Sequence, residues 1–192
     1  MADRRRREGF AEKRERLGAV DEPSVVLDAA LRFLEPRQRS VGEVRRRLTR
    51  VGYREDLVAA AIERLTELGM LDDEAFARAW VESRDRAHPR GQLALRQELA
   101  VKGIARETIA GVLTERDEST DGSGAPPDHT AALRLVGRHA RTLARITDPN
   151  SRRQRAYSLL ARRGFDPETA RSVAASFASE MGEGTEILPD DD

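Results

Sequence analysis

Residues 40–53 read SVGEVRRRLTRVGY, and two later segments repeat the same arrangement: GQLALRQELAVKGI at residues 91–104 and RRQRAYSLLARRGF at residues 152–165. Each segment places a Leu four residues before a Gly, and a large apolar residue directly after that Gly. A helix often ends in a left-handed residue, a conformation that Gly adopts readily, and the next apolar residue then folds back onto the last turn. The pattern predicts three equivalent helix ends, at Leu48, Gly52 and Tyr53, at Leu99, Gly103 and Ile104, and at Leu160, Gly164 and Phe165.

A further helix is predicted after each Gly. In the first copy, Val58, Ala61 and Ile62 have the i, i+3, i+4 spacing of one helix face. The other copies repeat this spacing at Ile109, Val112 and Leu113 and at Ala170, Val173 and Ala174. A longer apolar stripe precedes each pair, and in the third copy it predicts one helix over about residues 129–146. Each copy is therefore expected to contain three helices.

The start of the second copy carries the signs of a helix N-terminus. Asp72 is the predicted cap, and Leu71 and Phe76 flank it as an apolar staple. Trp80 follows Phe76 at helical spacing, so both are interpreted as core residues rather than as a platform for stacking nucleic-acid bases. The adjacent carboxylates of Asp72 and Asp73 are interpreted as helix-capping groups rather than as a catalytic pair.

These patterns predict an all-α chain of three tandem three-helix repeats, at residues 24–70, 71–117 and 129–181. Residues 118–128 are rich in Gly, Pro, Ser and Asp and are predicted to form a flexible linker. The first two repeats are therefore expected to form a stiffer pair than the last two. Residues 1–23 are predicted to be a basic flexible arm, and residues 182–192 an acidic tail.

The composition argues against several classes of function. The chain has no Cys, and its three His lack the spacing of a helical metal site. No apolar stretch approaches the roughly 20 residues that span a bilayer, and the charged N-terminus lacks the apolar part of a secretory signal. No phosphate-binding loop or nucleophile elbow is present. We expect a cytoplasmic protein without enzymatic activity, cofactor, metal or membrane contact.

The charge distribution points to an acidic partner. The 34 basic and 34 acidic residues cancel, but the acidic tail contains no base, so the rest of the chain is net positive. Almost every base is Arg, which binds phosphate in bidentate geometry, although a GC-rich genome would give the same bias. The candidate contact residues are Arg45, Arg46, Arg47, Arg50, Arg134, Arg138, Arg141, Arg145, Arg152, Arg153, Arg155, Arg162 and Arg163.

The alternative is that these arginines form solvated faces paired with Glu and Asp. That alternative is weaker in the third copy, because Asp148 is the one acidic residue between positions 129 and 163. The four cations from Arg134 to Arg145 also have the spacing of one face of a single helix. The third copy is therefore the more basic candidate surface.

Residues 30–113 resemble the RecX family of bacterial recombination regulators. The matching stretches are ALRFLEPRQRSVGEVRRRLTRVGY, AIERLTELGMLDDEAFARAWVESRDR and GQLALRQELAVKGIARETI. The resemblance implies three three-helix repeats in an elongated, curved body that lies in the groove of a RecA filament. It also implies that the chain binds the RecA protein and the RecA–DNA filament, and suppresses strand exchange and ATP hydrolysis. The long linker, the arm and the tail depart from the family pattern.

Two other readings remain open. The short Gly turns between helices also suit a helix-turn-helix protein that binds single- or double-stranded DNA directly. Against base-specific readout, the three copies share no set of Asn, Gln or Arg at the start of their last helix. A scaffold that binds neither RecA nor DNA is the third reading. In each case we expect a monomer.

Overall fold

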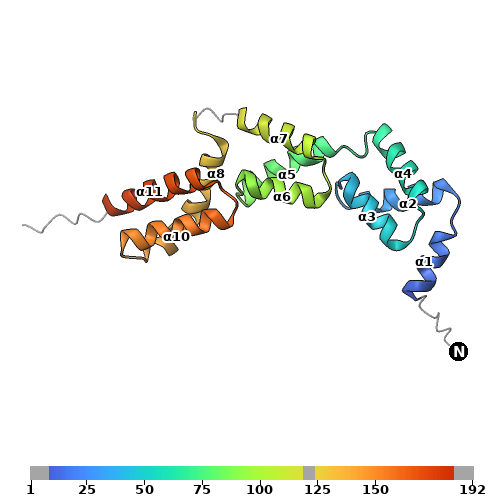
Figure 1. The fold of residues 1–192 in the computed structure, drawn as a ribbon, viewed down its shortest axis with the longest axis horizontal. Helices are drawn as coiled ribbons and strands as arrows, with labels where there is room; N and C mark the ends of the chain where they lie inside the picture. Colours follow the sequence, from blue (N-terminus) through green and yellow to red (C-terminus); the bar gives the residue numbers. More distant parts are fainter. Residues whose placement is uncertain (1–8, 119–123, 184–192) are drawn as a thin grey trace, which may run out of the picture. The chain divides into compact units, whose positions relative to one another are not determined.

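The computed structural model describes residues 9–118 and 124–183, and these residues form eleven helices and no strand (Figure 1). The prediction of an all-α fold built from three-helix repeats is confirmed: α2–α4 and α5–α7 form two repeats, and α8–α11 form the third with one extra short helix. The helices are α1 (Phe10–Gly18), α2 (Pro23–Leu34), α3 (Val41–Val51), α4 (Glu55–Glu67), α5 (Asp73–Ala87), α6 (Gln92–Lys102), α7 (Arg106–Glu118), α8 (Pro127–Arg138), α9 (Ala140–Ala144), α10 (Pro149–Arg162) and α11 (Pro167–Glu183).

The described residues divide into two compact units. The first contains residues 9–77 and 101–105, and the second contains residues 78–100, 106–118 and 124–183. Most of the second repeat is therefore grouped with the third, whereas the sequence led us to expect a stiffer pair of the first two. The physical reason is a buried ion cluster, described below, that joins α5, α7 and α8.

The helix ends follow the glycine pattern of the sequence. Gly52 and Gly164 have φ values of +116° and +77°. After each Gly the chain bonds back to the Leu of the pattern: the N–H of Tyr53 donates to the carbonyl oxygen of Leu48, and that of Phe165 to Leu160, both at 3.3 Å. Gly103 is also left-handed, with φ +87°. The three predicted helix ends are confirmed.

The core of the first unit lies between α2, α3 and α4. Val26, Val44, Val58 and Leu65 are fully buried, and Leu48 is nearly so. These residues are the apolar stripes of the three helices, turned toward one another. Asp72 caps α5 by accepting hydrogen bonds at 2.9 Å from two backbone N–H groups of the first turn, as predicted.

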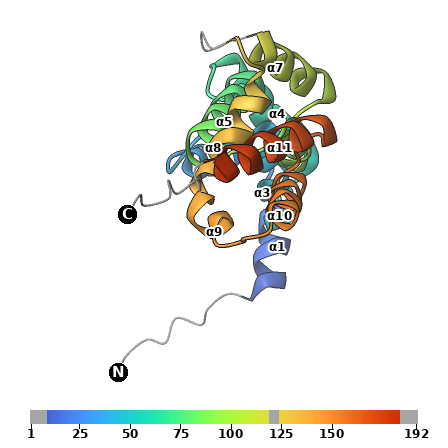
Figure 2. The ribbon, with the colours of Figure 1, turned by 90° about the vertical axis from the view of Figure 1, so that its left-hand side faces the viewer.

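The core of the third repeat lies between α8, α10 and α11, and Figure 2 shows α10 beside α11. Small residues occupy its centre: Ala132, Ala156, Ala170 and Ala174 are fully buried. Because Ala has only a Cβ, the helix backbones can approach closely there. Leu160 completes the packing at the end of α10.

The predicted flexible arm is partly wrong, because residues 10–18 form the helix α1. Leu17 is buried with 6% exposure, and a Cβ on Gly52 would lie 2.8 Å from the backbone oxygen of Arg14. Helix α1 therefore packs tightly against the end of α3, because Leu17 is buried there and Gly52 has no side chain to keep the two backbones apart. Residues 1–8 of the predicted arm, residues 119–123 of the predicted linker and residues 184–192 of the acidic tail lie outside the described residues.

The single helix predicted over residues 129–146 is also wrong, since α8 and α9 are separate helices. His139 between them has φ −103° and ψ 6°, and its ring Nδ1 lies 3.0 Å from the carbonyl oxygen of Leu135. The first helix begins two residues earlier than predicted because Pro127 suits the first helical position. The four cations from Arg134 to Arg145 therefore do not share one helix face.

Two glycine joints connect successive repeats, one within each unit. In the first unit, a Cβ on Gly42 near the start of α3 would lie 2.6 Å from the last carbonyl oxygen of α6, and 2.8 Å from the Cα of Gly103. In the second unit, a Cβ on Gly91 before α6 would overlap the carbonyl oxygen of Gly164 after α10. There the N–H of Gly91 donates to the carbonyl oxygen of Arg163 at 3.0 Å. Each joint brings the backbone at one helix end against the start of another.

Candidate functional site

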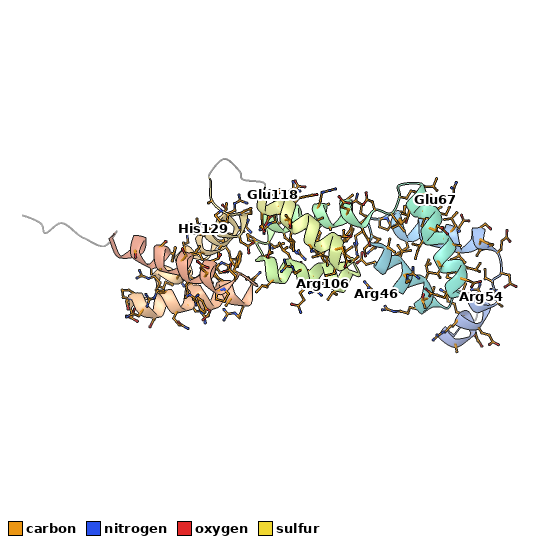
Figure 3. All side chains as sticks on the ribbon, turned by 45° about the horizontal axis from the view of Figure 1, so that its top comes forward. Arg46, Arg54, Glu67, Arg106, Glu118 and His129 are labelled. Carbon is orange, nitrogen blue, oxygen red and sulfur yellow. The ribbon has the colours of Figure 1, made fainter. Side chains whose placement is uncertain are left out.

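The predicted contact residues on α3 are mostly engaged within the first unit. Arg45 pairs with Glu55 at the start of α4. Arg46, labelled in Figure 3, donates to two carbonyl oxygens at the end of α6, at 3.0 and 3.1 Å. Arg47 lies 5.7 Å from the centroid of an aromatic ring on α2, and Arg50 is exposed. The alternative of a face paired with Glu and Asp therefore describes Arg45, whereas Arg46 binds backbone carbonyl groups instead.

Two predicted contact residues on α8 serve as helix-capping groups for α5. Arg134 lies 3.5 Å from the carbonyl oxygen of Asp85, and Arg138 donates to those of Arg86 and Ala87 at 2.8 and 2.5 Å. Cations placed at a helix C-terminus satisfy its last carbonyl groups and compensate the helix dipole. These two side chains therefore help to hold α8 against α5.

Arg152 is not a surface residue, so its prediction as a contact with a partner is wrong. The residue is 7% exposed, and its Nε donates to the carbonyl oxygen of Ile146 at 3.0 Å. Its Nη2 lies 3.5 Å from the carbonyl oxygen of Thr147. The side chain therefore lies against the turn between α9 and α10, where it contacts two backbone carbonyl groups.

The remaining cations of the third repeat form the candidate site. They are mostly exposed, and none makes a hydrogen bond or ion pair through its side chain within the described part of the chain. Nearby acidic residues are engaged elsewhere: Asp148 and Asp166 accept backbone N–H groups at the starts of α10 and α11. A surface with unpaired guanidinium groups attracts polyanions. The unpaired cations are Arg141, Arg145, Arg153, Arg155, Arg162, Arg163 and Arg171.

A hollow between α10 and α11 brings some of these cations beside an aromatic ring. Its volume is about 430 Å³, and it is lined by Arg153, Gln154, Tyr157, Arg171 and two alanines. A second hollow of about 300 Å³ shares Arg153 with the first and continues toward the start of α10. The half-buried ring of Tyr157 thus lies in a shallow groove with a guanidinium group from each helix. We call this the α10–α11 groove.

The α10–α11 groove has the chemistry of a single-strand contact. Aromatic rings stack on unpaired bases, and Arg side chains bind phosphate oxygens in bidentate geometry. Sequence reasoning missed Tyr157 and Arg171. Arg171 lies on a different helix from Arg153, so only the pairing of α10 with α11 brings them together. The one signal for this groove in the sequence was the i, i+4 spacing of Arg153 and Tyr157, which places the two side chains on the same face of a helix.

Comparisons with known proteins show the family of the chain. Residues 27–65 match the family model "RecX, first three-helix domain", and residues 72–113 match "RecX, second three-helix domain". The chain is 36% identical over 152 residues to the regulatory protein RecX of Mycolicibacterium vanbaalenii, covering 76% of this chain and 78% of that protein. The chain belongs to the RecX family.

Other RecX proteins extend this result. The regulatory protein RecX of Mycolicibacterium smegmatis is 34% identical over 151 residues, covering 77% of each chain. The crystal structure of RecX from Lactobacillus salivarius has the same fold, with a TM-score of 0.68 at 20% identity, covering 82% of this chain and 97% of that one. The two matched domain models end at residue 113. The α10–α11 groove and α1 therefore lie outside the matched RecX domains.

Within the second RecX domain, Trp80 lies in a polar cluster. The residue is half-buried, its Nε1 donates to Glu98 Oε2 at 2.9 Å, and the guanidinium of Arg84 lies 4.3 Å from the centroid of its ring. Arg84 Nε also donates to Glu98, at 2.7 Å. The interpretation of Trp80 as a core residue is therefore only partly right, because its ring is shielded on one face by a cation.

A buried arginine joins the RecX second domain to the third repeat. Arg116 on α7 donates to both carboxylate oxygens of Asp85 on α5 at 2.9 Å, and to Asp128 on α8 at 2.6 Å. Burial disfavours the charged guanidinium, but the hydrogen bonds that it donates to both carboxylates outweigh this effect and raise the pKa of Arg116. In Figure 3, the labels Glu118 and His129 mark the two helices that supply Arg116 and Asp128.

For Asp128, in contrast, the effect of burial on the pKa exceeds that of the hydrogen bonds. Burial raises the pKa of its carboxyl group, while hydrogen bonds from the N–H of Gln92 and from Arg116 act to lower it. Its Oδ2 accepts the N–H of Gln92 at the start of α6, at 2.9 Å. One carboxylate therefore connects three helices of the second unit.

No group of three or more His, Asp or Glu side chains within residues 9–118 and 124–183 is placed to hold a metal ion. Among the helices that the structure describes, none is long and apolar enough to cross a membrane.

Proposed function

We propose that this chain binds the RecA protein and the RecA–DNA filament, and inhibits recombination and ATP hydrolysis by RecA. The RecX family is one of regulatory proteins, which supports a regulatory role without enzymatic activity. The observation that carries the proposal is the unpaired arginine surface of the third repeat, which offers cations to a filament that contains nucleic acid. As a partner of RecA, the chain would act in the cytoplasm, as a monomer.

The proposed mechanism is regulation by multiple weak contacts. Tandem repeats present long surfaces that can follow a helical polymer, and linked contacts strengthen one another through their effective concentration. A chain bound along the filament would block a second DNA strand and restrain the ATPase cycle. Different affinities for the filament and for the free RecA protomer would also shift the assembly equilibrium.

Direct binding to single-stranded DNA is a second candidate function, favoured by the α10–α11 groove. Tyr157 supplies a ring for stacking, and the two arginines beside it supply phosphate contacts. Binding of this kind would be independent of sequence and would weaken steeply as salt increases. It would occur without RecA, which separates it from the first proposal.

The test is a titration of the chain into single-stranded DNA, with and without RecA, at two salt concentrations. ATP hydrolysis and DNA binding are followed together. We expect the chain to lower the ATPase rate, and the double variant Arg153→Glu, Arg171→Glu to require at least tenfold more protein for the same inhibition. The matched control is Arg106→Glu, because Arg106 is an exposed cation of the same unit outside the groove.

Three results distinguish the proposals. An ATPase rate unchanged at saturating concentration would exclude regulation of RecA. If the double variant inhibits the ATPase as strongly as the unchanged chain, the regulatory role stands, but the α10–α11 groove takes no part in it. Binding to DNA alone, lost in Tyr157→Ala and kept in Arg106→Glu, would favour the second candidate.

A further inference from the structure

A second basic groove lies in the first unit, between α1, α2 and α3. Its volume is about 450 Å³, and we call it the α1–α3 groove. Four cations line it: Lys13 and Arg16 from α1, Arg32 from α2, and Arg47 from α3. Six aliphatic side chains and the ring of Tyr53 form the rest of its wall. The other lining residues are Leu17, Val20, Val25, Ala29, Leu48, Val51 and Tyr53.

Helix α1 creates this groove by forming one of its walls. Leu17 anchors the helix, and Gly52 lets its backbone approach the end of α3. The helix precedes residue 27, where the first RecX domain model begins. The α1 wall of the groove therefore lies outside the residues that match this model, whereas Arg32 and Arg47 lie within them. The use of the groove goes beyond the proposed function of the third repeat.

The charges in the α1–α3 groove are not balanced from within. None of the described residues lining it is acidic. Within the described chain, Lys13, Arg32 and Arg47 have no carboxylate partner. Several cations elsewhere in the described part of the same unit do have one, although Arg46 and Arg50 do not: Arg37 pairs with Glu43, Arg45 with Glu55, Arg54 with Asp21 and Asp56, and Arg64 with Glu67. The groove therefore lacks the carboxylates that accompany these four cations.

The walls of the groove favour a protein segment over nucleic acid. Val25 is 41% exposed there, and the lining is mainly branched or small aliphatic side chains. Such side chains pack against Leu, Ile or Val of a partner, whereas unpaired bases stack on flat aromatic rings. A nucleic acid would satisfy the cations but leave the aliphatic wall without a matching apolar group.

We propose that the α1–α3 groove binds a short acidic segment of a partner protein, in which carboxylates flank one or two aliphatic side chains. The carboxylates pair with Lys13, Arg32 and Arg47, and the aliphatic side chains cover Val25 and its neighbours. Charge complementarity sets the orientation of the segment, and apolar burial supplies part of its affinity.

The test measures the fluorescence anisotropy of labelled probes against the full chain. The probe is the peptide EDELLDEIEDE, compared with its amide version QNQLLNQIQNQ, its serine version EDESSDESEDE and the oligonucleotide (dT)12. We expect only the first peptide to bind, and charge reversal at Arg32 or Arg47 to weaken it about fivefold or more. Arg64→Glu is the matched control, since Arg64 is an exposed cation of the same unit outside the groove.

Circular dichroism of each variant checks that the helices persist. The proposal is overturned if the amide or serine peptide binds as tightly as the acidic one, or if Arg64→Glu weakens binding as much as Arg32→Glu. Tighter binding of (dT)12 than of the acidic peptide would identify the groove as a nucleic-acid site instead. Peptide binding that requires removal of residues 184–192 would identify the chain's own tail as the occupant, and would equally overturn the proposal.

Discussion

Replacing Arg116 by Met removes the cation that holds two carboxylates in the second unit. Arg116 is 8% exposed and makes hydrogen bonds to Asp85 and Asp128 on two other helices. The Asp128 side chain is only 13% exposed, so water cannot replace the lost guanidinium fully. Breaking one side of a buried ion pair destabilises a protein by about 3–5 kcal/mol. We expect a loss of that size in the second unit at pH 7.

The loss should depend on pH in a defined direction. Burial already raises the pKa of Asp128 above its ordinary value of 3.8, and removing Arg116 takes away a hydrogen bond that lowers it. A carboxyl group with a raised pKa stabilises the folded chain below its unfolded pKa, and this stabilisation disappears as pH rises through the folded pKa. The deficit of Arg116→Met should therefore be smallest near pH 4 and grow toward pH 7.

Native-state hydrogen exchange in α7 and α8 measures this loss for the second unit alone. The double variant Arg116→Met, Asp128→Asn is the companion measurement. It removes one uncompensated charge while keeping an acceptor for the N–H of Gln92, so it should recover part of the deficit. A deficit below about 1 kcal/mol at pH 7, or one that falls as pH rises, would refute the assignment of this cluster as a stabilising buried ion group.

Four further substitutions test the local structure. Gly52→Ala should destabilise the first unit by at least about 1 kcal/mol in urea denaturation, because Gly52 has φ +116° and α1 lies against the position of the added Cβ. Gly111→Ala should instead stabilise the second unit by about 0.5–1 kcal/mol, because Gly111 lies within α7 and nothing else in the described chain lies within 4 Å of the added Cβ. Trp80→Phe removes the hydrogen bond to Glu98 and should lower the free energy of unfolding by about 1 kcal/mol; an unchanged urea midpoint would contradict this. Asp72→Ala removes a helix cap and should speed hydrogen exchange in the first turn of α5, at a loss of about 1 kcal/mol, with exchange in α10 unchanged.

The parts of the fold that could be predicted depend on neighbours in sequence. A helix end at Gly52 or Gly164 needs only a Leu four residues earlier and an apolar residue afterward, and both ends formed as expected. The cap at Asp72 depends on N–H groups two and three residues away. Such patterns are visible in a single sequence because the interacting groups lie within one turn of each other.

The fate of individual arginines could not be predicted in the same way. Arg152 has the helical position and charge of a surface residue, but it turns back to bind the carbonyl of Ile146. Arg116 attracted no attention in the sequence, because its two carboxylates come from other helices. Whether a cation is free depends on which acceptors the tertiary packing brings to it.

The α10–α11 groove and α1 were missed for related reasons. Arg171 joins Tyr157 only through the packing of two helices. Residues 10–18 carry too few apolar residues to predict a stable isolated helix, and docking of Leu17 beside Gly52 supplies the missing stabilisation.

The residues that connect successive repeats at the glycine joints are different from the residues that the repeats expose to solvent. The closest approach at each joint is between backbone groups, at Gly42 with Gly103 and at Gly91 with Gly164, with the side chain of Arg46 beside the first pair and that of Ala94 beside the second, so most outward side chains take no part in it. One repeat can therefore accumulate arginines while its neighbour accumulates ion pairs, without altering the register between them. The same close approach makes the connection sensitive to substitution, because a single added methyl group at any of these four glycines must displace a helix end.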